Sequence, residues 1–245
     1  MKEIQLERNM FAYPGVGDPK WCQGMIDRWN RTPDETKVTA LFRDGVYEIE
    51  IPTCYDPDDP DYNEELWSIW KGVDEEIEAV TRPCLDQYLS HFFLVTPIEY
   101  TYVGTKMLYY PPYAISPMHY DDELMSAAGG TYGQARPITQ VIYLNQDFEG
   151  GEVWFPEQKV SLKPETGLVA TFPGSFMYPH TTNPTCRKDR FILLPFYVKS
   201  GLNCKIEKFN NILDSSSADL KEYAALYDPG REIKVEGHVP LREIK

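Results

Sequence analysis

The sequence predicts a mainly β protein of the α+β class, with supporting helices first and an antiparallel sandwich or barrel after residue 97. Apolar residues recur at helical spacing in the first part of the chain, whereas short apolar and aromatic runs alternate with turn residues from Ile98 to Lys199. The presence of 17 Tyr and 20 Pro also favours strands and ordered loops over long helices.

Two segments of the first part have the periodicity of amphipathic helices. One runs from Asp18 to Trp29 and begins with an Asp-Pro pair, which suits the N-cap and the first turn. The other runs from about Asn63 to Ser90, and Pro83 is expected to kink or split it, because proline has no amide hydrogen to donate. Between them lie a strand-like stretch, Val38–Ile51, and a loop rich in Pro and Asp.

The second part contains seven candidate strands in about 100 residues, which implies two facing sheets. They are Ile98–Tyr102, Thr105–Tyr110, Ile138–Leu144, Glu152–Phe155, Val160–Leu162, Leu168–Phe172 and Phe191–Tyr197. The long Gly- and Ala-containing segment Asp122–Arg136 lies between strands, so we interpret it as a flap over a site. The loop Tyr55–Tyr62 is a second candidate cover.

At 245 residues the chain is long enough for one compact domain with a real core. We expect three parts within that domain: an N-terminal support at 1–97, a β core at 98–199 and a C-terminal extension at 200–245. A helix is expected in the extension, near Ser217–Tyr227.

The formal net charge of -14, with no run of Lys or Arg, weighs against a nucleic-acid or anionic-membrane partner. The 5 Cys are odd in number and scattered without a Cys-x-x-Cys pair, which indicates reduced thiols and a cytoplasmic location. No stretch approaches the roughly 18 apolar residues of a membrane span, and the first residues lack the apolar region of a signal peptide. We therefore expect a cytoplasmic protein without a membrane partner, and we make no prediction of its oligomeric state.

Two of the 4 His lie in the strand-rich half next to chemically interesting neighbours. His119 and Asp121 are two positions apart, hence on one face of an extended strand, where both side chains can reach one metal ion. His180 would complete the two imidazoles and one carboxylate of non-haem Fe(II) oxygenases, in which three coordination positions stay open. A lone His-x-Asp also arises by chance, and a surface histidine beside acidic residues is the alternative.

Arg190 makes this interpretation more specific. It comes ten positions after His180, at the start of the apolar strand Phe191–Tyr197. A guanidinium that enters a barrel interior needs an anion, because an unpaired buried charge costs on the order of several kcal/mol. Its planar fork can bind the distal carboxylate of 2-oxoglutarate through two parallel hydrogen bonds. The alternative is a surface ion pair with Asp189 or Glu152.

A series of short motifs in this half resembles the prolyl 4-hydroxylase-like branch of the 2-oxoglutarate oxygenases. In order, they are Tyr143-Leu144-Asn145, the Phe148-Glu149-Gly150-Gly151-Glu152 turn followed by Phe155-Pro156, Lys163-Pro164 with Gly167, Phe172-Pro173, His180 and Arg190. The resemblance covers about Ile98 to Lys199. It implies a double-stranded β-helix, or jelly roll, with the N-terminal helices packed on one sheet.

The resemblance also implies roles for single residues. His119, Asp121 and His180 would bind Fe(II), and Arg190 would bind the C5 carboxylate of 2-oxoglutarate, with no catalytic residue beyond the metal ligands. The implied cofactors are Fe(II), 2-oxoglutarate as cosubstrate and O2, with ascorbate as an optional reductant.

Tyrosines complete the implied cosubstrate pocket. Tyr143 would donate a hydroxyl hydrogen bond to the C5 carboxylate, and Tyr110, in preference to Tyr109, would line the pocket, although aromatic residues in strands are usually core. The chain departs from the family where Tyr113 or a neighbour replaces a Gly, where Phe196 stands for a Trp, and where Arg replaces the Lys of many collagen-type enzymes. These departures keep the cofactor chemistry but weaken the inference that proline is the substrate.

The predicted function is therefore hydroxylation of an unactivated C–H bond by a 2-oxoglutarate-dependent dioxygenase. A prolyl residue of a peptide or protein is the closest candidate substrate, and a free amino acid or small metabolite is the alternative. A non-catalytic jelly-roll binding protein and a zinc hydrolase are the rivals, and Arg190 argues against the hydrolase. Nucleic-acid demethylases normally have a second Arg on the last strand, which Phe191–Tyr197 lacks.

Overall fold

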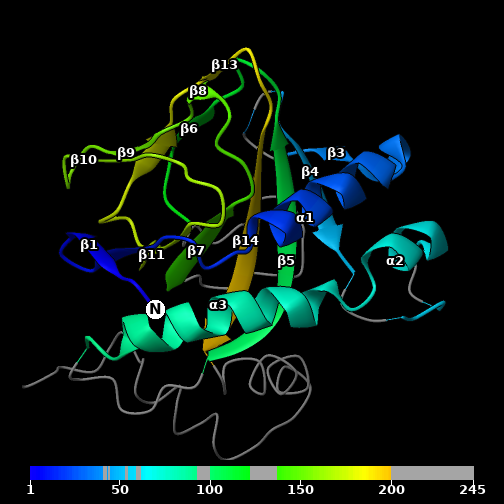
Figure 1. The fold of residues 1–245 in the computed structure, drawn as a ribbon, viewed down its shortest axis with the longest axis horizontal. Helices are drawn as coiled ribbons and strands as arrows, with labels where there is room; N and C mark the ends of the chain where they lie inside the picture. The colour runs from blue at the N-terminus through cyan, green and yellow to red at the C-terminus, as the bar shows by residue number, and fades with distance from the viewer. Residues whose placement is uncertain are drawn as a thin grey trace, which may run out of the picture. The chain divides into compact units, whose positions relative to one another are not determined.

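A computed structural model of the chain describes residues 1–40, 43, 45–52, 55–58, 62–92, 100–121 and 137–199 (Figure 1). The expected flap at 122–136 and the expected extension at 200–245, with its helix, lie outside these residues. Of the loop 55–62, only residues 55–58 and 62 are described.

The described strands form two main antiparallel sheets. The large sheet contains, in spatial order, β1 (Ile4–Glu7), β2 (Met10–Tyr13), β11 (Val169–Pro173), β7 (Ile138–Tyr143), β14 (Arg190–Lys199), β5 (Tyr100–Tyr110), β4 (Tyr47–Ile51) and β3 (Val38–Thr39). The small sheet contains β10 (Val160–Leu162), β9 (Val153–Phe155), β12 (His180–Thr182) and β6 (Ser116–His119). Two further short strands, β13 (Thr185–Cys186) and β8 (Glu149–Gly150), pair with each other.

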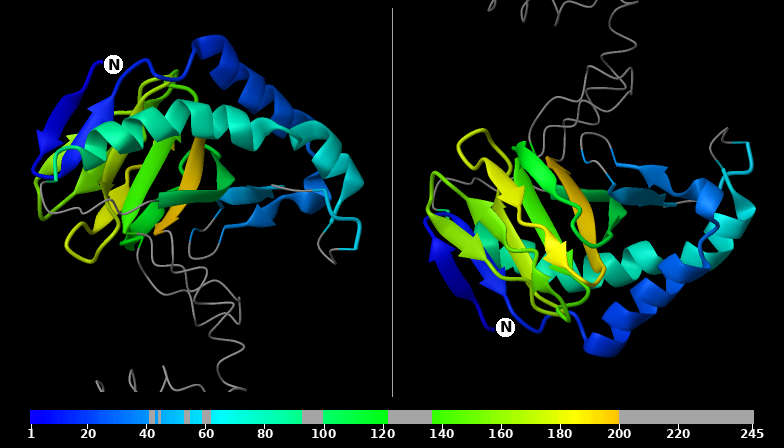
Figure 2. Two further views of the ribbon diagram at one scale, coloured as in Figure 1. Left: turned by 90° about the horizontal axis from the view of Figure 1, so that it is seen from below. Right: turned by 90° about the horizontal axis from the view of Figure 1, so that it is seen from above.

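The large sheet separates two hydrophobic clusters. On β14, Phe191 and Leu193 belong to the cluster that contains the helical side chains, whereas Ile192 and Leu194 belong to the cluster shared with the small sheet. This alternation is the period of two that a strand imposes on its side chains. The helices α1 (Pro19–Arg31) and α3 (Val73–Leu89) lie on one side of the strands, as the right panel of Figure 2 shows. The predicted jelly roll with helices on one sheet is confirmed.

The first helix begins and ends where its sequence indicates. The carboxylate of Asp18 accepts hydrogen bonds from the amides of Lys20 and Trp21 at 2.8 and 3.3 Å, and a proline opens the first turn. These contacts satisfy amides that have no partner within the helix. Its apolar side chains are buried against the sheet. In the described part of the chain, no helix is long and apolar enough to cross a membrane.

The second helical segment is split, but not at Pro83 as the sequence predicts. It consists of α2 (Glu64–Trp70) and α3, and the break lies at Lys71-Gly72, where Gly72 has φ +77°. Pro83 lies inside α3 at an exposed position. Water can reach the carbonyl that loses its partner there, whereas the positive φ at residue 72 ends a helix outright.

The strand predictions also need two corrections. The predicted break between Tyr102 and Thr105 is absent, because β5 is continuous and pairs along its length with β14, with a bulge at Phe196–Tyr197. Five short strands, β1, β2, β8, β12 and β13, are not predicted from the sequence, and of β6 only an extended strand at His119 is predicted. Each has only two to four residues, which is too short to show the alternation by which a strand is recognised.

One close backbone contact joins the start of the chain to the jelly roll. The Gly17 amide donates to the Gly167 carbonyl at 2.9 Å, and a Cβ on Gly167, where φ is +75°, would lie 2.0 Å from the Gly17 oxygen. We expect Gly167→Ala to lower the free energy of unfolding in urea by roughly 3 kcal/mol, because strain and overlap add. At Gly15 φ is also positive, but an added Cβ would meet open space. We therefore expect Gly15→Ala to lower the free energy of unfolding by only about 1 kcal/mol. Equal losses in the two variants would contradict this explanation.

Candidate metal centre

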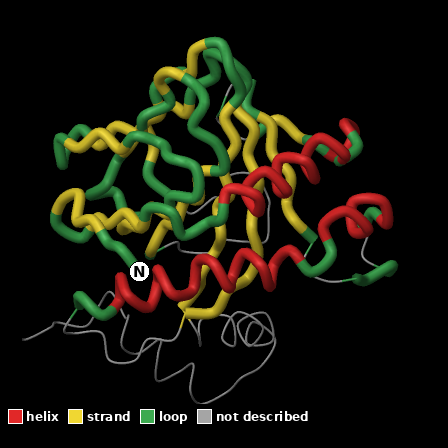
Figure 3. The backbone as a smooth tube through the Cα atoms, in the orientation of Figure 1, coloured by secondary structure: helices red, strands yellow, loops and turns green. Residues whose placement is uncertain are grey.

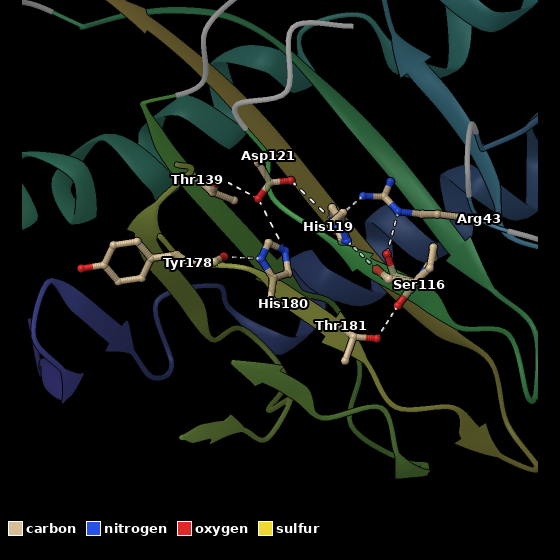
Figure 4. A network of polar contacts seen from close by, with 9 residues as sticks. Arg43, Ser116, His119, Asp121, Thr139, Tyr178, His180 and Thr181 are labelled. Atoms are coloured by element: carbon tan, nitrogen blue, oxygen red, sulfur yellow. Dashed lines mark hydrogen bonds and ion pairs between the residues drawn. The ribbon is translucent and has the colours of Figure 1, made fainter. Parts of the chain in front are cut away.

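His119, Asp121 and His180 come together between the two sheets. His119 and His180 face each other as directly paired residues of β6 and β12. The Nε2 atoms of His119 and His180 lie 3.7 and 3.6 Å from the two carboxylate oxygens of Asp121 (Figure 4). One ligand atom from each of the three residues lies within 4.8 Å of the others. Such an arrangement can hold one metal ion.

A bulge in β6 allows His119 to face the interior. Along β12 the paired residues advance by two, from His180 to Thr182, while along β6 they advance by three, from His119 back to Ser116. The extra residue leaves Pro117 and Met118 exposed, while Ser116 is buried. A bulge of this kind redirects side chains near functional sites.

Asp121 reaches the centre in a different way from that predicted. The strand ends at His119, and Asp121 lies in the turn that follows, so alternation along a strand does not place it. The hydroxyl of Thr139, at the start of β7, donates to Asp121 Oδ2 at 2.8 Å. This hydrogen bond orients the carboxylate toward the two imidazoles.

Both imidazoles present Nε2 to the centre. His119 Nδ1 lies 2.7 Å from the Pro117 carbonyl, and His180 Nδ1 lies 3.1 Å from the Tyr178 carbonyl. A carbonyl oxygen only accepts, so each Nδ1 carries the hydrogen and each Nε2 carries a lone pair. Backbone contacts of this type fix the tautomer and the ring orientation of metal-binding histidines.

The environment keeps His119 neutral. Burial lowers the pKa of His119 to about 4, helped by the charges of His180 and Arg43 and opposed by Asp121. At neutral pH a metal therefore does not have to displace a proton from this ring. The rings of Phe155 and Phe172 pack against His180 with centroids 5.1 and 5.2 Å away. They give the centre an apolar wall.

Arg190 is buried in the same jelly-roll interior, with 1% of its surface exposed. It pairs with Tyr110 across β14 and β5, and its Cζ lies 4.0 Å from the centroid of the Tyr110 ring. Nη1 donates to the Gly151 carbonyl at 3.1 Å. Within the described residues, Arg190 Nε has no hydrogen-bond partner, and neither does the hydroxyl of the fully buried Tyr143.

These two buried groups suit a carboxylate. Burial raises the pKa of Tyr143 even though the charge of Arg190 lowers it, so the phenol keeps its proton and can donate. A buried guanidinium whose Nε lacks an acceptor and a buried phenol without one are both costly, and one carboxylate can accept from both. The predicted pocket residues Arg190, Tyr143 and Tyr110 thus lie together.

The alternatives for this region do not match the geometry. Asp189 accepts a hydrogen bond from Tyr109 at 3.1 Å, and in the described part of the chain neither Asp189 nor Glu152 forms an ion pair with Arg190. Tyr109 lies on the helix side of the sheet, where its ring stacks on Phe191. Of the two adjacent tyrosines, only Tyr110 lies on the jelly-roll side of the sheet, next to Arg190.

The residues present fit the implied cofactors. Two imidazole nitrogens and one carboxylate are the protein ligands that non-haem Fe(II) oxygenases use, and they leave open positions for other ligands. The unpartnered donors of Arg190 and Tyr143 fit a dicarboxylate cosubstrate. The roles of these side chains as iron and oxoacid ligands remain predictions from their chemistry.

Two residues that contact the centre, Thr139 and Arg43, are not predicted from the sequence. A threonine at the start of a buried strand and a single arginine in a strand-like stretch are ordinary features, so no sequence signal marks either one. Most of the small-sheet side is loop (Figure 3), and loop paths decide which side chains reach the centre.

The hydrogen bond from Thr139 to Asp121 leads to a testable expectation. We expect Thr139→Val to weaken Mn(II) binding by about 10-fold to 100-fold, because contacts that orient a metal ligand have effects of this size. Thr171→Val is the matched control, since Thr171 is buried in the same sheet and contacts Gln140 instead. Calorimetric titration of both variants with Mn(II) is the measurement, and equal affinities would contradict the role of Thr139.

Comparison with known proteins agrees with this geometry. The model of the 2OG-Fe(II) oxygenase superfamily matches residues 106–198. No curated protein matches the chain in sequence.

Solved structures of prolyl hydroxylases have a similar fold. The viral collagen prolyl hydroxylase of Paramecium Bursaria Chlorella virus-1, solved with 2OG, has a TM-score of 0.54 and 16% identity over 78% of this chain and 96% of that chain. A Pseudomonas putida prolyl-4-hydroxylase has a TM-score of 0.53 and 18% identity over 79% and 94%. The Trichoplax adhaerens prolyl hydroxylase, in complex with a hypoxia inducible factor peptide fragment, has a TM-score of 0.51 and 15% identity over 78% and 84%.

The fold and the family model together define a metal-dependent jelly-roll oxygenase. Residues 106–198 match the model of the 2OG-Fe(II) oxygenase superfamily, and the class of activity that this match and the His-Asp-His cluster support is that of a 2-oxoglutarate-dependent dioxygenase.

Proposed function

We propose that this dioxygenase hydroxylates an unactivated C–H bond in a peptide or protein, with a prolyl residue as the first candidate. The observation that supports the chemistry is the His119, Asp121 and His180 cluster in the same interior as the unpartnered donors of Arg190 and Tyr143. The fold similarity to prolyl hydroxylases, one of them solved with a peptide, supports the substrate class.

The chain's own residues have three tasks in this reaction. The His-Asp-His cluster would hold the metal ion through two imidazole nitrogens and one carboxylate, a ligand set that leaves room for further ligands. Arg190 and Tyr143 bind the distal carboxylate of the cosubstrate and set its orientation. The rings of Phe155 and Phe172 keep water from the centre. Bound Fe(II), 2-oxoglutarate and O2 supply the oxidation, in which the cosubstrate loses CO2 and becomes succinate while the substrate is hydroxylated.

Two alternatives make different predictions. A hydroxylase of a free amino acid or small metabolite would use the same cluster and the same Arg190, but it would not act on peptides. A non-catalytic jelly-roll protein would show no iron-dependent turnover. We also propose a cytoplasmic location, which rests on the scattered cysteines, of which Cys22 and Cys84 are buried free thiols.

The test is anaerobic titration of the protein with Fe(II) and 2-oxoglutarate, followed by exposure to air and measurement of succinate. Proline-containing peptides, free L-proline and other amino acids are then added in parallel, and mass spectrometry detects the gain of one oxygen atom. We expect succinate release to rise with a peptide. Stimulation by free amino acids alone would overturn the substrate proposal, and no succinate under any condition would overturn the enzymatic one.

A further inference from the structure

A second arginine lies directly against the metal centre. Arg43, in the turn between β3 and β4, places Nη2 3.2 Å from Nε2 of His119, the nitrogen that faces Asp121. Its Nε donates to the Ser116 hydroxyl at 2.9 Å (Figure 4). The Arg43 guanidinium therefore approaches the centre beside His119, whereas the Arg190 side chain extends from β14.

The turn that bears Arg43 is anchored by its own backbone. The Arg43 amide donates to the Ala40 carbonyl at 3.2 Å, and the Val46 amide donates to the Arg43 carbonyl at 3.1 Å. Both Ala40 and Val46 are buried in the jelly-roll core. The Ser116 carbonyl in turn accepts from Thr181 at 2.7 Å, so the residue that contacts the guanidinium is itself held in place.

The positively charged guanidinium of Arg43 is suited to bind an anion at this position. Within the described residues its side chain contacts two neutral acceptors, the His119 ring and the Ser116 hydroxyl, and a metal ion on His119 Nε2 would take the lone pair that now faces Arg43. A guanidinium and a divalent metal ion that share one imidazole as neighbour repel each other, unless a negatively charged group lies between them. A carboxylate suits this position, because one oxygen can bind the metal while the other accepts from the guanidinium.

We propose that Arg43 is a second carboxylate-binding residue of the site, which holds the C1 carboxylate of 2-oxoglutarate beside the metal. This inference rests on the proposed function. Arg190 and Tyr143 then bind one end of the cosubstrate and Arg43 the other, so that each carboxylate of the dianion meets one guanidinium. Arg43 touches the cosubstrate and selects for an oxoacid over a simple ketone.

The experiment uses Mn(II) as a redox-silent metal and compares Arg43→Gln with the wild type by calorimetry. We expect Mn(II) alone to bind the variant at least as tightly, because a neighbouring cation is removed. We expect 2-oxoglutarate to bind the Mn(II)-loaded variant about 10-fold to 100-fold more weakly, the usual effect of losing a charged hydrogen bond. Arg43→Lys keeps the charge and should recover part of the affinity.

A second probe locates the effect along the cosubstrate. In 4-oxopentanoate a methyl group replaces the C1 carboxylate. Its affinity is measured by its ability to displace 2-oxoglutarate, and we expect the affinities of Arg43→Gln and of the wild type for 4-oxopentanoate to differ less than 2-fold. Arg190→Gln should weaken the binding of both 2-oxoglutarate and 4-oxopentanoate. Arg31→Gln, at the exposed end of α1, is the matched control for the loss of one arginine.

Three results overturn the proposal: unchanged affinity of Arg43→Gln for 2-oxoglutarate, weaker binding of Mn(II) alone, or an equal loss for both ligands. In the first case Arg43 does not touch the cosubstrate, and a substrate carboxylate becomes the remaining partner. Failure of the proposed function looks different, since the wild type itself would then bind no 2-oxoglutarate in the presence of Mn(II).

Discussion

Replacement of His180 by alanine is expected to abolish metal binding and, with it, the release of succinate. His180 Nε2 is one of three ligand atoms in the cluster, and removing contacts that only orient such ligands already weakens metal binding by about 10-fold to 100-fold. We therefore expect the Kd for Mn(II) to rise by at least about 100-fold. Calorimetry with Mn(II), and succinate measurement with Fe(II) in air, test this expectation.

His91→Ala is the matched control for this change. His91 stacks on Phe11 and contacts Glu3, and the metal-ligand cluster does not include it. The control variant should bind Mn(II) as the wild type does. If His180→Ala and His91→Ala were both indistinguishable from the wild type, the metal centre would not exist as described.

The second large effect concerns Arg190. We expect Arg190→Met to weaken binding of 2-oxoglutarate on the order of 100-fold, because it removes a buried charge that pairs with the ligand carboxylate. Metal binding should stay unchanged, since Arg190 does not belong to the metal-ligand cluster. Calorimetric titration of the Mn(II)-loaded variant with 2-oxoglutarate measures the loss.

The thermal stability of ligand-free Arg190→Met should not fall, although the variant binds 2-oxoglutarate more weakly. A buried guanidinium with an unpartnered Nε is costly, and an apolar side chain of similar length often replaces buried charges without loss of stability. We expect the ligand-free Tm of Arg190→Met to equal or exceed that of the wild type, while the increase in Tm caused by 2-oxoglutarate disappears. A strongly reduced ligand-free Tm would mean that Arg190 is structural. Tyr143→Phe, which removes one hydroxyl, should weaken the binding of 2-oxoglutarate by only about 10-fold.

Much of the site could be predicted because its chemistry depends on side-chain type. Two imidazoles, one carboxylate and an arginine at the head of an apolar strand are rare together. The helix at Asp18–Trp29 and the strands around Ile138–Leu144 were also predictable, because capping and hydrophobic period are local properties.

What failed depends on contacts between distant parts of the chain. Pro83 has a strong local signal for a break, but its exposed position tolerates the missing hydrogen bond. The break lies instead at Gly72, where the backbone has a positive φ. The bulge in β6 has no local signal at all, because it exists only relative to the register of β12.

By itself, the sequence predicted an antiparallel sandwich or barrel, three candidate metal ligands and Arg190 as a partner for a carboxylate, and its family resemblance implied the jelly roll and the role of Tyr143 as a hydrogen-bond donor. Only the tertiary structure decided how Asp121 enters the centre from a turn, that Thr139 orients it, and that Arg43 reaches His119 from another hairpin. The physical reason is that side-chain chemistry is carried by each residue, whereas hydrogen bonds across tens of residues exist only after the strands have paired.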